Sequence, residues 1–373
     1  MLARKLNVSV EYLETGRELG EDAQRELRLA DAELKLRLDD GEKAAAALRE
    51  ILAEAVECGD TLSMARAHTA LGFAAFQAGR QHEAIEHLEA GLQVLAPSPA
   101  ARPDVYGTLG QAYSLAGRPE RAVELFRKCL AELQEQAPED DATHVRFATY
   151  LSYALSNLGD LTGAQVAVHE ALARVGRESD PYTRVRLYWS LARLAEFEGR
   201  SVTALSYMRR AIALLEATDD TLHLARAHQF SARILLLPGG DLERAAEEIE
   251  RAEELYGSHA AANDVASLRV DQAWIAARQG DGSTALTLAR EALDTLGEDD
   301  PGERGRAWRA IADAHIALDD IDQADPAFRR AAALLAEHGH ARGRVEVHRA
   351  WGRALASAGR EAAAAEAFGR ADT

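Results

Sequence analysis

An alanine returns about every forty residues along this chain, and a bulky apolar residue follows it four positions later in most repeats. Residues four apart share one helix face, so each repeat predicts a helix with a small and a large apolar residue on its buried side. A stack of two-helix units requires such a register, because each unit buries its apolar face only against its neighbours. The recurring alanines are Ala44, Ala84, Ala122, Ala164, Ala204, Ala245, Ala285, Ala324 and Ala364. The bulky residues are Leu48, Leu88, Phe126, Val168, Met208, Ile249, Phe328 and Phe368.

Turn residues mark the same period. Five positions before the alanine stands Asp39 or Asp319 in two repeats and a glycine in the others. Glycine suits a tight turn because it enters left-handed backbone conformations without strain. The pairs Asp180-Pro181 and Asp300-Pro301 predict helix starts, with aspartate as the cap and proline in the first helical turn. The glycines are Gly79, Gly117, Gly159, Gly199, Gly240, Gly280 and Gly359.

The third repeat carries a recognisable motif. It reads Tyr106-x2-Leu109-Gly110-x2-Tyr113-x3-Gly117-x4-Ala122-x3-Phe126. This spacing resembles the tetratricopeptide repeat (TPR) family. The resemblance implies an all-α fold: a right-handed superhelical solenoid of about nine helix-turn-helix units of about forty residues over 22–373. The alternative, an alanine-rich helical bundle, gives no reason for a forty-residue period.

The first eighteen residues do not follow the repeat. Leu2, Leu6, Ser9, Tyr12 and Leu13 stand in a pattern that resembles the last helices of the Cro/repressor helix-turn-helix domain. Residues 1–18 are therefore expected to be a remnant of such a domain or a helix that caps the first repeat. The helix that reads bases in that family would lie upstream, so we expect DNA binding only through a domain missing from this chain.

Composition narrows the function further. The formal net charge is −18, which disfavours a repeat body that grips a phosphate backbone. The sequence has no apolar run long enough to span a membrane and no signal-peptide pattern, so a cytoplasmic location is expected. Cys58 and Cys129 lie far apart, and Cys129 is most simply a packed thiol. No phosphate-binding loop, zinc motif or nucleophile–base pair occurs, so we expect no enzyme activity, no cofactor and no metal.

Function is expected on the surface that the first helix of each unit presents. By the register of the TPR family, one groove-facing position is arginine in five of seven units, and another position lies two turns further along the same helix. Guanidinium groups suit carboxylates and aromatic rings supply anchoring area, so the predicted ligand is a short peptide or protein segment with acidic groups or a free C-terminus. The alternative is that these arginines pair with acidic residues of adjacent helices. The candidate residues are Tyr153, Asn157, Arg186, Trp189, Arg193, Arg226, Gln229, Phe230, Arg233 and Trp274.

The combined resemblances imply a role in regulation. The chain looks like the C-terminal sensor domain of bacterial helix-turn-helix transcriptional regulators, a group that includes receptors for signalling peptides. A peptide in the concave groove would change the pitch of the superhelix, and a homodimer is expected. The alternative is a passive protein-interaction scaffold with no DNA role.

Overall fold

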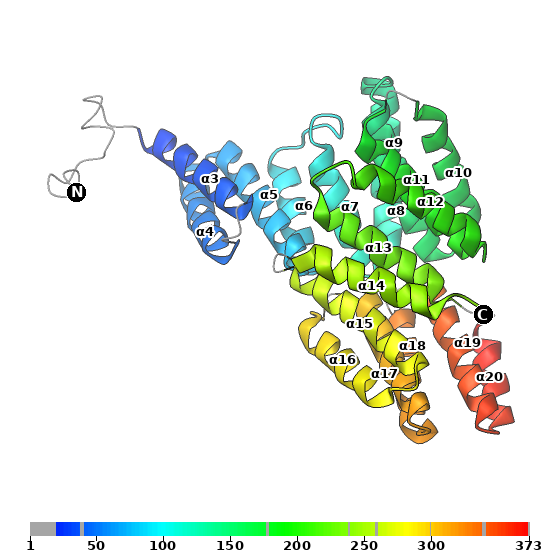
Figure 1. Cartoon of the computed structure of the whole chain (residues 1–373). Helices are drawn as coiled ribbons and strands as arrows, with labels where there is room; N and C mark the ends of the chain where they lie inside the picture. Colours follow the sequence, from blue (N-terminus) through cyan, green and yellow to red (C-terminus); the bar gives the residue numbers. More distant parts are fainter. Residues whose placement is uncertain are drawn as a thin grey trace. The chain divides into compact units, whose positions relative to one another are not determined.

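The computed structural model describes residues 20–37, 41–176, 179–237, 239–257, 260–298, 300–337 and 341–371. Within these ranges the chain forms eighteen helices and no strand (Figure 1). The predicted all-α solenoid of about nine helix pairs is confirmed. The predicted helix-turn-helix remnant, residues 1–18, lies outside the described residues.

Each predicted unit consists of two helices, and the recurring alanine lies on the second. The first helices are α3 (Glu21–Arg37), α5 (Thr61–Gln77), α7 (Pro103–Leu115), α9 (Asp141–Leu158), α11 (Pro181–Phe197), α13 (Thr221–Leu235), α15 (Ala262–Arg278), α17 (Pro301–Ala317) and α19 (Ala341–Ser357). The second helices are α4 (Gly41–Cys58), α6 (Gln81–Val94), α8 (Pro119–Gln136), α10 (Leu161–Arg174), α12 (Ser201–Leu215), α14 (Leu242–Tyr256), α16 (Gly282–Thr295), α18 (Ile321–Glu337) and α20 (Glu361–Ala371).

Contacts group the chain into two compact units. One contains the described residues up to Gln77 together with Glu83–Pro97, and the other contains Ala78–His82 and the described residues from Ser98 onward. In the second unit every helix from α7 to α20 contacts the next one along the chain. First helices also contact each other, since α9 meets α11, and α15 meets both α13 and α17. All ten predicted site residues lie in this second unit.

The recurring alanines and bulky residues form the core that the register predicts. Every one of the nine alanines is at most 4% exposed. The bulky residues are similarly buried except Phe368, which is 38% exposed on α20, the last described helix. Gly110 shows why the repeat needs a small residue on its first helix. A Cβ atom there would lie 2.1 Å from Cζ of Phe126, so glycine permits the close approach of α7 and α8.

Where it is described, the residue five positions before the recurring alanine lies in a turn between the two helices of its unit. Gly159 has a φ of 83°, in the left-handed region, and closes α9. Asp319 takes the same conformation with a φ of 57°, as its place in the repeat predicts. Gly240 takes the recurring glycine position between α13 and α14, but it is its neighbour Gly239 that has the positive φ, 80°. A Cβ atom on Gly240 would meet the Leu235 carbonyl oxygen at 1.9 Å, so this glycine serves a close backbone approach.

The helix starts are capped as predicted. The Asp180 side chain accepts a hydrogen bond from the Thr183 backbone N–H, and the Asp300 side chain accepts one from Glu303. Pro181 and Pro301 each occupy the first turn of their helix. None of the described helices combines the length and apolar character that a membrane crossing requires.

Candidate functional site

The predicted site residues lie on four first helices. Eight are half-buried, whereas Gln229 and Phe230 are buried, at 5% and 7% exposure. Tyr153 and Asn157 lie on α9, and Trp274 lies on α15. Helix α11 carries Arg186, Trp189 and Arg193, and helix α13 carries Arg226, Gln229, Phe230 and Arg233. The structure divides these residues into two clusters with different chemistry.

The first cluster joins arginines to aromatic rings. The Arg186 guanidinium donates a 2.8 Å hydrogen bond to the Tyr150 hydroxyl and lies 5.7 Å from the centre of that ring. The Arg193 guanidinium lies 4.6 Å from the Tyr153 ring centre and 5.2 Å from the Phe230 ring centre. These distances are within the range of cation–π attraction. We call this set, together with Trp189, the aromatic–arginine cluster.

Trp189 completes this cluster from α11. Its ring stacks on Phe230 of α13, with centroids 5.8 Å apart and planes 4° apart. The parallel rings add to the area they bury, because offset aromatic pairs attract each other. Helices α9, α11 and α13 thus contribute to one continuous arrangement of rings and guanidinium groups.

The second cluster joins arginines to carboxylates. Arg226 donates two hydrogen bonds, 2.9 and 2.8 Å long, to the two carboxylate oxygens of Asp264. Arg233 bonds to Asp271 at 2.9 Å, and Arg306 of α17 pairs with the same carboxylate. Asp271 is fully buried, so both guanidinium groups offset the cost of its charge. We call this set the ion-pair network. Its arginines pair with acidic residues of other helices, as in the alternative that the sequence left open.

Polar side chains extend the ion-pair network. Gln229 donates a 2.7 Å hydrogen bond to Asp271 and accepts one of 2.8 Å from the Tyr256 hydroxyl. Ser267 accepts a 2.6 Å bond from Arg233 and donates a 2.8 Å bond to Glu303. Each buried group therefore has a partner, which is the condition for such a network to be stable.

Two neighbouring carboxyl groups at the start of α17 titrate in opposite directions. Burial, together with the nearby charge of Glu303, raises the pKa of Asp300 to about 7. Burial alone would raise the pKa of Glu303 too, but the guanidinium groups of Arg306 and Arg233 outweigh it and lower that pKa. Glu303 is thus the ionised member of the pair, and Asp300 is the one that holds a proton more tightly than usual.

Two donors at the predicted site are buried without a hydrogen-bond partner among the described residues. They are the side-chain nitrogen Nδ2 of Asn157 and the indole nitrogen Nε1 of Trp274. The Trp274 ring centre lies 4.9 Å from the Arg306 guanidinium and 4.8 Å from the Arg309 guanidinium. A buried donor without an acceptor costs free energy, so each of these nitrogens is a destabilising feature of the chain as described.

Several residues of the site were missed from the sequence. Tyr150 stands three residues before Tyr153 on α9, a spacing that puts both on one helix face. Asp264 and Asp271 each stand 38 residues after the arginine they bind. This shared offset is a sequence signal for the ion pairs. No group of three or more His, Cys, Asp or Glu residues among the described ones could hold a metal ion.

Two pockets outlined by described residues lie away from the ten predicted residues. One, of about 570 Å³, opens between α10, α11 and α12, and the other, of about 380 Å³, between α8, α9 and α10. None of the predicted residues lines either pocket. The predicted groove therefore stays a prediction, supported by contacts between side chains and not by a measured cavity.

Comparison with known proteins supports the repeat assignment. A tetratricopeptide repeat family model matches residues 103–131, the repeat with the clearest motif. Comparison with curated proteins finds no match.

Solved structures share the fold at low sequence identity. A Rap protein in complex with competence and sporulation factor has a TM-score of 0.69 and 15% identity, over 88% of this chain and 91% of that one. The Rap conjugation gene regulator of plasmid pLS20, in complex with the Phr* peptide, has a TM-score of 0.64 and 13% identity, over 84% and 96%. The Cut9–Hcn1 hetero-tetramer of the APC/C contributes a chain with a TM-score of 0.58 and 14% identity, over 87% and 56%. This chain thus spans little more than half the length of that last relative, and the likenesses establish the fold alone.

Proposed function

We propose that this chain is the peptide-sensing TPR domain of a regulator. Two solved structures of the same fold, both of Rap proteins, were determined as complexes, one with the Phr* peptide and one with competence and sporulation factor. A peptide would lie along the first helices α9, α11, α13 and α15, where the ten candidate residues are found. The proposal carries over the kind of ligand from these relatives and takes its residues from this chain.

The observation that carries the proposal is the partner of Arg186. Its guanidinium bonds to the neutral Tyr150 hydroxyl and forms no ion pair with any described residue. In a protein with a net charge of −18, that arrangement leaves one positive group available for an external carboxylate. A guanidinium held in place by an aromatic ring loses less freedom on binding than a solvated one, which favours a bidentate contact with a carboxylate.

The ion-pair network limits where an acidic ligand can bind. Arg226 and Arg233 already hold Asp264 and Asp271, so a ligand carboxylate would have to displace a carboxylate that belongs to the chain. We therefore place the acidic group of the peptide at Arg186. Asn157 of α9 and Trp274 of α15 would lie along the same stretch of the peptide.

A regulatory output follows from the solenoid if ligand binding favours one curvature. Contacts in a repeat stack run between neighbours, so small changes at each interface add along the chain. A ligand can shift such an equilibrium only by its difference in affinity for the two shapes, typically about 1–3 kcal/mol. We propose a cytoplasmic homodimer that passes this change to a helix-turn-helix domain joined at residues 1–18, and through it to transcription.

The test begins with the ligand that the cell supplies. Native mass spectrometry of the chain purified from its source host is expected to show a bound peptide and a dimer. The identified peptide, synthesised with a free C-terminal carboxylate and as the C-terminal amide, is then titrated against the chain. Arg186→Gln should weaken binding of the acidic form about tenfold, because it removes a charge-assisted contact.

Arg226→Gln is the matched control, since it removes the same charge from the equivalent place on α13. The Arg226→Gln variant should bind the peptide with an affinity within about threefold of that of the unsubstituted chain. Equal losses in both variants would contradict the placement of the acidic group. A co-purifying protein in place of any peptide would instead favour the passive scaffold.

A further inference from the structure

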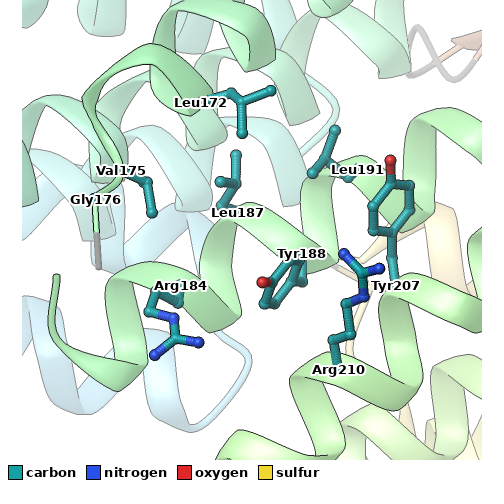
Figure 2. Close-up of a pocket in the computed structure, with 9 residues that line it drawn as sticks. All are labelled: Leu172, Val175, Gly176, Arg184, Leu187, Tyr188, Leu191, Tyr207 and Arg210. Carbon is teal, nitrogen blue, oxygen red and sulfur yellow. The ribbon is translucent and has the colours of Figure 1, made fainter. Parts of the chain in front are cut away.

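A second arrangement of arginines and tyrosines lies on the other side of α11. The pocket of about 570 Å³ between α10, α11 and α12 is shown in Figure 2. Leu172 of α10 and Leu187 and Leu191 of α11 supply apolar surface. In the same view the Tyr188 ring lies between the Arg184 and Arg210 side chains. The pocket therefore combines an apolar wall with two cationic groups.

Helix geometry separates this pocket from the predicted peptide site. Successive residues turn by about 100° in an α-helix, so positions 184, 188 and 191 share one face of α11. Arg186 and Arg193 also share a face, but the step from Arg184 to Arg186 is about 200°. The two arginine-bearing faces of α11 thus point in nearly opposite directions. A ligand in the pocket would not compete for the aromatic–arginine cluster.

The tyrosines hold one of the two guanidinium groups. The Arg210 guanidinium lies 5.8 Å from the Tyr188 ring centre and 5.9 Å from the Tyr207 ring centre. The two rings stack with centroids 6.4 Å apart. Cation–π attraction therefore positions Arg210 at the pocket without neutralising its charge.

Neither arginine of the pocket has a carboxylate partner among the described residues. Arg184 and Arg210 form no ion pair there, in contrast to Arg226, Arg233 and Arg306. The Tyr188 and Tyr207 hydroxyls also make no hydrogen bond to a described residue. Two positive groups and two hydroxyl donors thus surround an apolar cavity in an acidic protein. An anion with an apolar body satisfies both features at once.

We propose that this pocket binds a small organic carboxylic acid with an apolar body. Pockets for small ligands usually measure about 300–1,000 Å³ and combine an apolar lining with a few polar groups that fix orientation. The leucines would cover the apolar body, and the guanidinium groups of Arg184 and Arg210 would supply the positive charge that attracts the carboxylate. The site is separate from the proposed peptide site, and neither proposal depends on the other.

The probes are 3-phenylpropionate, indole-3-acetate and octanoate, each titrated into the full chain and followed by ligand-observed NMR and calorimetry. We expect at least one acid to bind in the millimolar range or tighter, and its primary amide to bind at least tenfold more weakly. Arg184→Gln and Arg210→Gln should each weaken binding of the acid about tenfold. Arg209→Gln is the control, because Arg209 is exposed beside Arg210 on α12 and does not line the pocket.

A second variant tests the apolar wall. Leu172 is 46% exposed, so Leu172→Glu should fold normally while it places a repelling carboxylate at the pocket. Binding of the acid should then be lost, with the thermal melt unchanged. The proposal is wrong if none of the three acids binds, if the amide binds as well as the acid, or if Arg209→Gln weakens binding as much as Arg210→Gln. Arg186→Gln should leave this binding unchanged, which separates the outcome from that of the peptide proposal.

Discussion

The aromatic–arginine cluster and the ion-pair network use the same repeat positions for different purposes. Arg186 and Arg193 on α11 stand forty residues before Arg226 and Arg233 on α13. The first pair meets aromatic rings and the second pair meets carboxylates. The role of an arginine in this solenoid is therefore decided by the neighbouring helix and not by its place in the repeat.

The sequence contains the reason for this difference. Asp264 and Asp271 stand 38 residues after Arg226 and Arg233. The same step from Arg186 and Arg193 leads to Leu224 and Ser231, neither of which can supply a carboxylate. Ser231 instead donates its hydroxyl to the Ala227 carbonyl in its own helix. Two differences in one helix thus account for the ion pairs of Arg226 and Arg233 and for the absence of the corresponding pairs at Arg186 and Arg193.

The largest effect is expected from breaking the ion-pair network at its centre. Asp271→Ala removes a buried carboxylate that Arg233, Arg306 and Gln229 all contact. Breaking a buried pair from one side typically costs about 3–5 kcal/mol, and we expect a loss of that size in the free energy of unfolding. Urea denaturation measures it. The matched control is Ser231→Ala, because Ser231 stands 38 residues after Arg193 as Asp271 stands 38 residues after Arg233. This substitution should cost about 1 kcal/mol or less.

The next effect depends on pH and concerns Asp300. Burial raises its pKa from 3.8 to about 7, so between these values the folded chain binds more protons than the unfolded chain. The free energy of unfolding should therefore fall as pH rises through this window, by up to about 1.4 kcal/mol per pH unit. Asp300→Asn removes the ionisation and can still accept the capping bond. Relative to the parent, it should gain stability between pH 4 and pH 8 in denaturant titrations.

A second N-cap provides the control for that experiment. Backbone hydrogen bonding from Thr284 is the largest cause that lowers the pKa of Asp281. Its ionised form is therefore the stabilised one, and Asp281→Asn should give no gain at pH 8. A gain in both variants would mean that the effect is not caused by burial of Asp300.

A smaller difference in stability is expected between two variants that each lack one arginine, one in the ion-pair network and one in the aromatic–arginine cluster. Arg226→Gln should cost about 1 kcal/mol of stability, since the pair with Asp264 is lost but the Arg226 side chain is 41% exposed and screened by water. Arg186→Gln should cost about 0.5 kcal/mol or less, because it leaves no carboxylate without a partner. Thermal melts of the two variants test this order. The reverse order would contradict the division of the site into a structural and a binding region.

The smallest effect on stability is expected at Tyr150. Tyr150→Phe removes the hydrogen bond to Arg186 but keeps the ring beneath the guanidinium, so stability should change by about 0.5 kcal/mol. Peptide affinity should still fall severalfold, because the guanidinium is less firmly held. Calorimetric titration with the co-purified peptide measures this, and Tyr182→Phe, an exposed tyrosine at the start of α11, is the control. Unchanged affinity in Tyr150→Phe would show that the hydroxyl does not position Arg186.

The forty-residue register was sufficient to predict the helix pairs and their buried alanines, and the two Asp-Pro pairs were sufficient to predict two capped helix starts. These features depend on contacts within a unit and with its neighbours, which the repeat itself encodes. The partners of the arginines were harder to predict, because one face of a first helix can meet either rings or carboxylates. The pocket around Arg184 and Arg210 was missed, since both lie outside the positions that the family register assigns to the groove. The predicted domain boundary at residue 18 and the ten site residues stay predictions.

Asp319 shows that the connection between two helices keeps its backbone conformation without the glycine found there in other units. It adopts a left-handed conformation that glycine provides elsewhere, and the next residue, Asp320, still caps α18 by accepting from the Gln323 backbone N–H. The helices on either side therefore impose the shape of the connection, and not the reverse. Connections of this kind are consequently places to insert a fluorescent label or an epitope without changing the spacing of the helix layers, except where the backbone approaches closely, as at Gly240.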